Sequence, residues 1–405
     1  MLRPFTPDRL RNTAIASLGL IAVSLGAWGV LNTLKRETTP LDAAQHQQHA
    51  GTHDIASTSI SSLLAEEPRP YIFAQSLPLE GPASHLGRSY SRGLDAALRA
   101  LNAAGGINGR PVRIWRLDDG YEPANTIRNT ALFTQHPEVL GLFGYVGTPT
   151  TKAVLAQAEA ANLTLIAPMT GASSLRQPGQ NLVVHFRASY AQESERIINH
   201  LVNDGYVRIA IAYQNDAYGQ DVLTSLLAAL KGHGLTAAST AKLPRNSTNI
   251  HDAATELSRS NPDALVVIST SKTMAALVDR LHHMGQSPQL MTISFTGTKA
   301  LFSDLPQRAS FGIGVTQVVP FPWDRRHPEV KRYQQVLHQQ SDQPDFDFIS
   351  LEGFLIGEWL GETLQSLGAN ITRQSLVKAL KATSPVNQDD NSVDLVFLGS
   401  GPWEP

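Results

Sequence analysis

The chain has 405 residues, of which 42% are hydrophobic and 17% charged, so it is long enough to bury the cores of two or three domains. Its 33 lysines and arginines nearly balance its 35 aspartates and glutamates, which argues against nucleic-acid binding through a basic surface. The absence of cysteine excludes disulfide bonds, thiolate metal sites, a cysteine nucleophile and the lipid-modified cysteine of a bacterial lipoprotein.

An uncharged, mostly apolar segment occupies residues 13–31 and follows Arg3, Arg9 and Arg11. The apolar region of a signal peptide is typically about 7–15 residues long, whereas a membrane-spanning helix needs roughly 17–25. Residues 1–35 are therefore interpreted as a signal peptide or a membrane anchor, and the length of the apolar segment favours the anchor. Either interpretation predicts that the rest of the chain is exported.

Residues 36–69 are polar and have no sustained helical or strand period, which predicts a flexible linker. The segment contains His46, His49 and His53, but histidines without supporting ligands are usually solvated. We therefore predict no metal site there and expect the folded part of the chain to begin near Pro70.

From Pro70 onward, short apolar runs alternate with segments of helical period. Strands are predicted at residues 71–74, 112–117, 139–146 and 163–167, with helices at 86–101, 124–135 and 150–161 between them. Alternation of this kind favours a parallel sheet covered by helices on both faces. These residues are predicted to form a first α/β lobe.

The alternation restarts near residue 207. Further strands are predicted at residues 207–213, 265–268, 290–293 and 311–319, with helices at 221–230 and 273–284. Later helices at residues 329–339, 349–367 and 372–382 are expected to cover the first lobe. Two arrays of similar order predict two facing lobes, with a ligand site between them.

Two loops of small residues, 144–151 and 167–172, follow predicted strands of the first lobe and precede segments expected to be helical. Such junctions place backbone N–H groups and hydroxyls at the carboxyl end of a parallel sheet, where an anionic or carbonyl group can bind. The alternative is that these residues only cap helices. The predicted ligand contacts are Gly147, Thr148, Thr150, Thr170 and Gly171.

Several motifs follow one another in a recognisable order. They are Leu77–Pro82, Asn102–Gly109, Asp118-Asp119, Gly144–Thr150, Ala167–Gly171, Phe186-Arg187 with Tyr190 and Glu193, and Asn215–Gly219. In this order they resemble the type I periplasmic solute-binding proteins, the leucine/isoleucine/valine-binding protein family of ABC-transporter substrate receptors. The resemblance covers residues 70 to 383. Each motif alone is loose, and their order makes the resemblance specific.

The resemblance implies an α/β protein with two Rossmann-like lobes, whose parallel-rich sheets are joined by a three-crossing hinge and preceded by an N-terminal hydrophobic helix. Lobe 1 is expected to comprise residues 70–188 plus 322–383, and lobe 2 residues 189–321 plus 384–405. The crossings are expected to be strand-like and to lie near Ala188–Ala191, Pro320–Trp323 and Thr383–Val386. The lobes are expected to close on a bound solute.

The resemblance also implies ligand contacts in the second lobe and an apolar wall between the lobes. The expected second-lobe contacts are Tyr190, Tyr218, Thr270, Ser271, Phe295 and Thr296. The expected apolar wall consists of Leu86, Met169, Phe295, Phe321 and Trp323, for which packing in the core or hinge is the alternative.

The ligand is expected to differ from an ordinary α-amino acid. Amino-acid binders of this family hold the ammonium group with acids from the second lobe, but the corresponding stretches here, residues 190–192 and 295–298, contain none. Leu86 stands where members of this family usually have a tyrosine, after the first Gly-Pro turn. An unpaired buried ammonium costs several kcal/mol. A carboxylate, an amide or a largely apolar molecule such as a lipid is therefore predicted.

Enzyme signatures are incomplete. Ser269–Lys272 matches S-x-x-K, but no S-D-N follows, and the chain has no P-loop, G-x-S-x-G or H-E-x-x-H motif. We therefore predict a monomeric, non-enzymatic periplasmic receptor without metal or cofactor, which delivers a small molecule or lipid to an inner-membrane transporter and associates with the membrane through its N-terminal segment. Two alternatives stay open: an anchored sensing domain with a signalling partner, and a branched-chain amino-acid binding protein.

Overall fold

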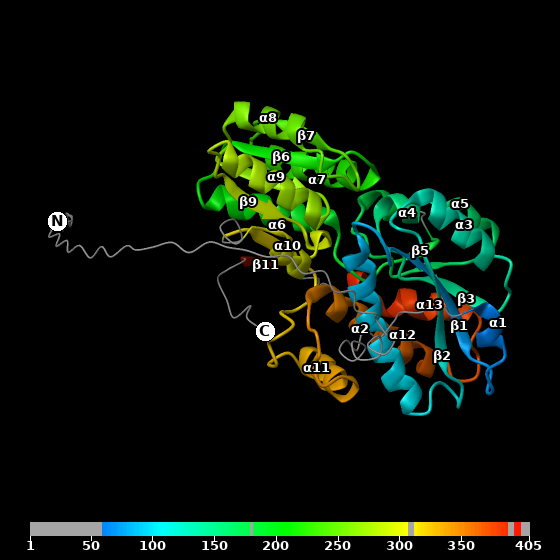
Figure 1. Cartoon of the computed structure of the whole chain (residues 1–405). Helices are drawn as coiled ribbons and strands as arrows, with labels where there is room; N and C mark the ends of the chain where they lie inside the picture. Colours follow the sequence, from blue (N-terminus) through cyan, green and yellow to red (C-terminus); the bar gives the residue numbers. More distant parts are fainter. Residues whose placement is uncertain (1–58, 179–180, 307–311, 388–392, 398–405) are drawn as a thin grey trace, which may run out of the picture. The chain divides into compact units, whose positions relative to one another are not determined.

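The computed structural model describes residues 59–178, 181–306, 312–387 and 393–397. The predicted signal peptide or anchor and most of the predicted linker lie outside these residues. No helix in the described part of the chain is long and apolar enough to cross a membrane. Two α/β lobes make up the described fold, each built around its own sheet (Figure 1).

Five parallel strands form the first sheet, in the order β2-β1-β3-β4-β5. Every residue of β1 is buried, as expected for an inner strand of a sheet that helices cover on both faces. The strands are β1 (Tyr71–Leu77), β2 (Val112–Asp118), β3 (Val139–Phe143), β4 (Leu165–Ile166) and β5 (Val183–Val184). The accompanying helices are α1 (Ile60–Leu64), α2 (Ser84–Ala103), α3 (Pro123–Phe133), α4 (Thr148–Ala153), α5 (Leu155–Ala160), α11 (Pro328–Gln340), α12 (Phe348–Ser366) and α13 (Arg373–Thr383).

Six strands form the second sheet, in the order β11-β10-β9-β8-β6-β7, and only the β10–β11 pair is antiparallel. Without β11, the strand order repeats that of the first sheet, which confirms the predicted fold class. The strands are β6 (Ile209–Gln214), β7 (Thr240–Leu243), β8 (Ala264–Ile268), β9 (Gln289–Thr292), β10 (Gly314–Gln317) and β11 (Asp394–Phe397). The helices are α6 (Tyr190–Asn203), α7 (Ala217–Gly232), α8 (His251–Ser260), α9 (Ser271–His283) and α10 (Thr298–Asp304).

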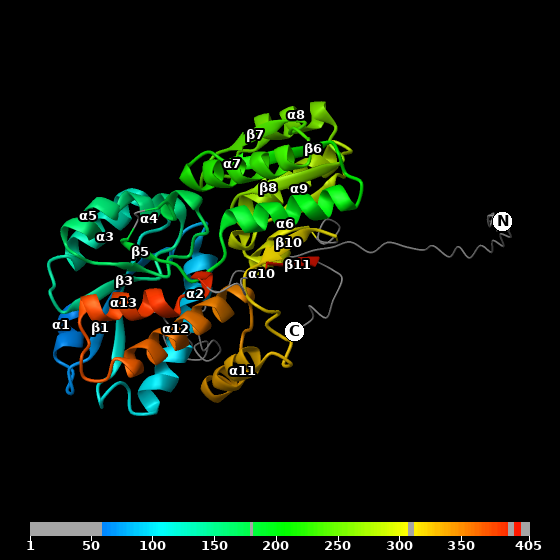
Figure 2. The same cartoon turned by 180° about the vertical axis from the view of Figure 1, so that it is seen from behind.

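The chain passes between the lobes three times, after β5, after β10 and after α13. These places lie near the predicted crossings, but none of the described crossing residues forms a strand. Residues 190 and 191 already belong to α6, and residues 385–387 form a 3-10 turn. Helices α12 and α13 return to the strands of the first sheet, as the view from behind shows (Figure 2).

Helices α2 and α12 pack unusually closely in the first lobe. A Cβ atom added at Gly93 would lie 1.7 Å from the carbonyl oxygen of Ser350, and one added at Gly353 would lie 2.1 Å from the carbonyl oxygen of Tyr90. Neither position has space for a side chain, because the neighbouring atoms belong to the backbone of the other helix. Glycine at these positions therefore sets the distance between the two helices.

The last residues of the predicted flexible linker include a helix that the sequence analysis did not predict. Residues 60–64 form α1, whose amino end is capped by the Ser59 side chain, and Leu63 is buried against the first lobe. Glu66 forms an ion pair of 2.9 Å with Arg113 on β2. One buried leucine in five residues is too short a pattern to reveal a helical period in the sequence.

Two predicted helices of the first lobe also differ. The helix expected at residues 150–161 is split into α4 and α5, because Val154 has φ −109° and ψ 1° and interrupts the hydrogen-bond ladder. No α-helix follows the loop of Thr170 and Gly171, where only residues 173–175 form a 3-10 turn. The Gly171 carbonyl instead accepts a hydrogen bond of 2.8 Å from the N–H of Tyr190.

Candidate functional site

Residues that follow strands at or near the switch point of each sheet belong to one buried group. In the first sheet the strand order reverses between β1 and β3, and in the second between β6 and β8. Open α/β sheets bind ligands at the carboxyl ends of the strands near such a point. The buried group includes Val146 after β3, Tyr218 after β6 and Phe295 after β9. We take this group as the candidate ligand site.

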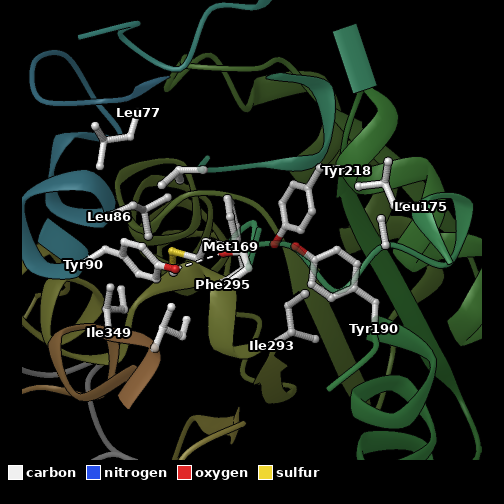
Figure 3. Packing of buried hydrophobic residues seen from close by; sticks show 14 of the residues in the cluster. Leu77, Leu86, Tyr90, Met169, Leu175, Tyr190, Tyr218, Ile293, Phe295 and Ile349 are labelled. Atoms are coloured by element: carbon white, nitrogen blue, oxygen red, sulfur yellow. Dashed lines mark hydrogen bonds between the residues drawn. The ribbon is translucent and has the colours of Figure 1, made fainter. Parts of the chain in front are cut away.

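Four aromatic rings form the centre of this site. The ring centroids of Tyr190 and Tyr218 are 5.6 Å apart, and Phe295 lies 4.7 Å from Tyr218 and 6.1 Å from Tyr121. These are separations of favourable aromatic contacts. Tyr121 comes from the first lobe and the other three from the second, so the rings join the lobes. The hydroxyls of Tyr190 and Tyr218 point inward toward Met169 and Phe295 (Figure 3).

The hydroxyls of Tyr121, Tyr190 and Tyr218 are buried and make no hydrogen bond of good geometry, although Tyr190 lies near Thr170 and Tyr121 near Gln214. Burial raises the pKa of Tyr190 to about 12, although Arg187 opposes the shift. Burial likewise raises the pKa of Tyr121 and Tyr218 far above the usual range, so all three are neutral donors. A buried polar group without a partner costs about 1–3 kcal/mol. A ligand or ordered water accepting these hydrogen bonds would remove that penalty.

The two predicted small-residue loops of the first lobe come together. The hydroxyl oxygens of Thr148 and Thr170 are buried and 2.7 Å apart. The hydroxyl of Thr150 donates instead to the carbonyl oxygens of Val146 and Gly147. Thr148 and Thr170 thus form a polar pair, whereas Thr150 stabilises its own turn.

Three predicted contacts of the second lobe use their hydroxyls locally. Ser271 donates to the Asp304 carboxylate at 2.7 Å and so links α9 to α10. Thr296 forms a hydrogen bond of 2.7 Å with Thr292, and Thr270 forms one of 3.3 Å within the start of its own helix. These hydroxyls therefore have partners within the second lobe, although none of them caps a helix through its side chain.

Two predicted glycines make room for the tyrosine rings. Gly147 has φ 98°, and a Cβ atom there would lie 2.2 Å from the Tyr121 ring. A Cβ atom at Gly171 would lie 2.6 Å from the Tyr190 ring. Both glycines therefore shape the site through the absence of a side chain.

The expected apolar wall is only partly brought together. Leu86 and Met169 are buried in the same cluster as the tyrosines, and Figure 3 shows both beside the aromatic group. Phe321 and Trp323 instead pack against Phe348, with centroid distances of 5.9 and 6.3 Å, in a separate cluster between α2, α11 and α12. Their inclusion in the wall was wrong, because the chain after β10 turns away toward α11.

Bonds between the lobes enclose the aromatic group. Arg245, in the loop between β7 and α8, donates to the Tyr121 carbonyl oxygen at 2.7 Å and pairs with the Glu122 carboxylate. On α7, the Asp221 carboxylate accepts the N–H groups of residues 173–174 at 2.8 and 3.0 Å. The described arrangement is therefore a closed one.

Sequence reasoning missed Tyr121, Gln214 and Arg245. Gln214 donates to Asp216 at 2.6 Å, and its own carbonyl oxygen is buried without a hydrogen bond. Tyr121 lies two residues after Asp119 of the acidic motif at residues 118–119, which is the only local signal for it. Arg245 has no such signal, because its contacts with Tyr121 and Glu122 join residues more than a hundred positions apart in the sequence.

A buried group of charges lies where the chain first passes between the lobes. Arg187 has a side chain 1% exposed, and its Nε lies 3.5 Å from Oε1 of Glu352 on α12. Glu193, on α6, accepts hydrogen bonds from the Ser294 N–H at 2.8 Å and the Thr316 hydroxyl at 2.5 Å. Burial opposes the charge of Arg187, but Glu352 and Glu193 hold its pKa above the usual value. Within the described residues, no group of three or more potential ligands could hold a metal ion.

Asp119 fixes the turn that carries Tyr121. One of its oxygens accepts hydrogen bonds from the hydroxyls of Ser76 at 2.8 Å and Thr126 at 3.1 Å, and the other accepts the Tyr121 N–H at 2.9 Å. Burial raises the pKa of Asp119 to about 6, although these hydrogen bonds oppose the shift. The folded state therefore favours the protonated carboxyl.

We expect the Asp119→Asn variant to lose part of the pH dependence of folding. In the native protein, the stability gained by proton uptake is full below the unfolded pKa of 3.8 and is lost as pH rises through about 6. A shift of this size corresponds to about 3 kcal/mol. Chemical denaturation at several pH values measures it, and an equally steep fall in the variant's stability over this window would contradict the assignment.

Comparison with known proteins agrees with this architecture. A family model described as periplasmic binding protein matches residues 73–397. An amino acid binding protein of Pseudomonas aeruginosa is 20% identical over 241 residues, which are 59% of this chain and 64% of that protein. The chain thus spans about 60% of the length of the curated relatives it matches.

Solved structures share the fold. A possible leucine/isoleucine/valine-binding protein from Rhodopirellula baltica is 31% identical, with a TM-score of 0.73 over 77% of this chain and 85% of that one. A fatty acid ABC transporter substrate-binding protein from Thermomonospora curvata is 18% identical, with a TM-score of 0.69 over 77% of this chain and 80% of that one. The chain therefore belongs to the periplasmic binding proteins, a family of solute-binding receptors rather than enzymes, with the type I fold of the leucine/isoleucine/valine-binding proteins.

Proposed function

We propose that this protein captures a small organic ligand between its lobes in the periplasm and delivers it to an inner-membrane transporter. One observation carries the proposal: three buried tyrosine hydroxyls from both lobes share one site and lack hydrogen-bond partners. Native proteins pair nearly all buried polar groups, so unpaired donors in one place indicate a missing acceptor. Membrane association through residues 1–35 and a monomeric state remain predictions.

Thirteen residues are proposed to bind or shape the ligand site. Those in the first lobe are Leu86, Gly147, Thr148, Thr150, Met169, Thr170 and Gly171, and those in the second are Tyr190, Tyr218, Thr270, Ser271, Phe295 and Thr296. The strongest support is for Tyr190 and Tyr218, whose buried hydroxyls are unpaired, and for the buried Thr148–Thr170 pair. Thr150, Thr270 and Ser271 have the weakest support, since their hydroxyls have local partners.

The proposed ligand is a small molecule with hydrogen-bond acceptors and an apolar body, and not an ordinary α-amino acid. The two acids nearest the tyrosines are both engaged. Asp216 caps α7 by accepting the Tyr218 N–H at 3.0 Å and lies 3.8 Å from the Arg245 guanidinium. The Glu193 carboxylate accepts a hydrogen bond from the Ser294 N–H, and its charge helps to hold the pKa of Arg187 above the usual value. An ammonium group in the site would therefore compete for carboxylates that already have partners.

Amino-acid binding is the second candidate. The name of the Pseudomonas aeruginosa relative favours it, and so does one oxygen of Glu193 that is buried without a hydrogen bond. The Thermomonospora curvata neighbour, which is named for fatty acid transport, shows that the same fold also occurs in a receptor named for a ligand without an ammonium group.

Leucine and 4-methylpentanoate separate the two candidates, because they share a carbon skeleton and differ only in the ammonium group. We expect calorimetry to show at least about tenfold tighter binding of 4-methylpentanoate, since a buried charge without a free partner costs more than about 1.4 kcal/mol. Equal or tighter binding of leucine would favour the amino-acid receptor. Mass spectrometry of molecules released from the purified protein would show independently whether a ligand is captured.

A further inference from the structure

Tyr121 has a backbone conformation that few residues of its size adopt. Its φ is 65°, and it follows Gly120, whose φ is 57°. A bulky side chain in the left-handed region is strained and persists only where its surroundings impose it. Here the Tyr121 N–H donates to the buried Asp119 carboxylate at 2.9 Å. This left-handed turn, and no regular element, determines where the Tyr121 ring lies.

The turn sends the ring across the boundary between the lobes. The side chain is 0% exposed and lies over Gly147, where a Cβ atom would be 2.2 Å from the ring. Its centroid is 6.1 Å from that of Phe295 in the second lobe. The hydroxyl lies near the Gln214 amide but forms no hydrogen bond with it. The Tyr121 hydroxyl is thus a buried donor that makes no hydrogen bond, beside an amide whose carbonyl oxygen is also unpaired.

Arg245 holds this turn from the opposite lobe. Its guanidinium donates to the Tyr121 carbonyl oxygen at 2.7 Å, pairs with Glu122, and has its Cζ 5.7 Å from the centroid of the Tyr121 ring. Asn246 adds a hydrogen bond of 2.8 Å to Glu122. Closure of the lobes therefore fixes the position of Tyr121 through two neighbouring residues of the β7–α8 loop.

The three unpaired hydroxyls belong to one group of contacting rings. Phe295 lies 6.1 Å from Tyr121 and 4.7 Å from Tyr218, and Tyr218 lies 5.6 Å from Tyr190, between ring centroids. One ligand group can therefore meet all three. A carboxylate offers two oxygens and about four lone pairs, whereas a primary amide has one oxygen with two.

We propose that Tyr121 is a specificity-determining residue, whose hydroxyl joins those of Tyr190 and Tyr218 in donating hydrogen bonds to a carboxylate of the ligand. The assignment rests on the proposed function and narrows it to organic acids. It also places part of the selectivity in the first lobe, at a residue that the opposing lobe holds only when the two lobes are closed.

The test compares 4-methylpentanoate with 4-methylpentanamide by calorimetry, in the full chain and in the Tyr121→Phe variant. We expect the full chain to prefer the acid, and the variant to bind the acid about tenfold more weakly while losing most of that preference. Tyr333→Phe is the matched control, since it removes a buried hydroxyl that bonds to Ser350 in another cluster. This control is expected to leave binding unchanged.

The contrary outcomes are distinct. Preference for the acid with equal affinity in the Tyr121→Phe variant would overturn the role of Tyr121 and leave the proposed function standing. Preference for the amide, or binding of neither probe by a protein that releases another small molecule on denaturation, would overturn the carboxylate assignment alone. Binding of neither probe by a protein that releases no small molecule would count against the proposed function as well.

Discussion

Replacing Gly353 by alanine is expected to destabilise the protein by about 3 kcal/mol, because the added methyl group has no space. Its Cβ would lie 2.1 Å from the Tyr90 carbonyl oxygen and 3.2 Å from the Leu94 nitrogen, both in the backbone of α2. Only separation of α12 from α2 can relieve such overlap. Tyr90 also donates a hydrogen bond of 3.0 Å to Ala167 in the site loop, so we expect weaker ligand binding as well.

Gly361→Ala on the same helix is the control. Its Cβ would meet only the end of the Leu101 side chain, at 3.2 Å, and alanine is favoured over glycine within a helix by about 1 kcal/mol. Urea denaturation followed by circular dichroism compares the two variants. Similar stability of the Gly353 and Gly361 variants would show that α12 can shift without penalty and that the close approach is not a constraint.

Much of the fold was predictable because it depends on local periodicity. The apolar runs at residues 207–213 and 265–268 correspond to β6 and β8, and the helical pattern at 349–367 corresponds to α12 almost residue for residue. Strand β11 was not predicted, because four residues whose side chains stay partly exposed give little alternation to detect. Its pairing with β10 joins segments almost eighty residues apart.

The candidate site was predictable only where its residues lie in strand-end loops. Thr148 and Thr170 were expected together because parallel strands place their carboxyl ends at one edge, and their hydroxyls are 2.7 Å apart. Tyr121 depends on a left-handed turn and on Arg245, which is 124 positions away. No window of sequence contains both partners, so neither composition nor periodicity could indicate this contact.

The charges at the first crossing depend on long-range contacts in the same way. Arg187 pairs with Glu352 on α12 and donates a hydrogen bond to the Ser294 hydroxyl of the second lobe, and thereby ties both lobes to the crossing segment. Burial raises the pKa of Glu352, Arg187 opposes that shift, and Glu193 adds to it. The Arg187 guanidinium thus favours the charged form of a carboxyl that burial would otherwise neutralise.

The Arg187→Met variant is therefore expected to lose about 3–5 kcal/mol of stability near neutral pH, since it leaves two buried carboxylates without their cation. Without Arg187, the pKa of Glu352 should rise further. A raised folded-state pKa means that proton uptake stabilises the fold at low pH and that this stability is lost as pH rises through that pKa. The variant should accordingly regain stability on acidification, more than the native protein does.

Arg208→Met provides the comparison for this substitution. Arg208 forms an exposed ion pair of 2.6 Å with Asp263 in the second lobe, and solvent screens such pairs so that they contribute little to stability. Denaturation curves at several pH values compare the free energy of unfolding of the two variants. If Arg187→Met cost no more than Arg208→Met, or if its stability fell on acidification, Arg187 would not be neutralising the buried glutamates. The expected result would instead show that the buried charges at the crossing, and not apolar packing alone, hold the two lobes together.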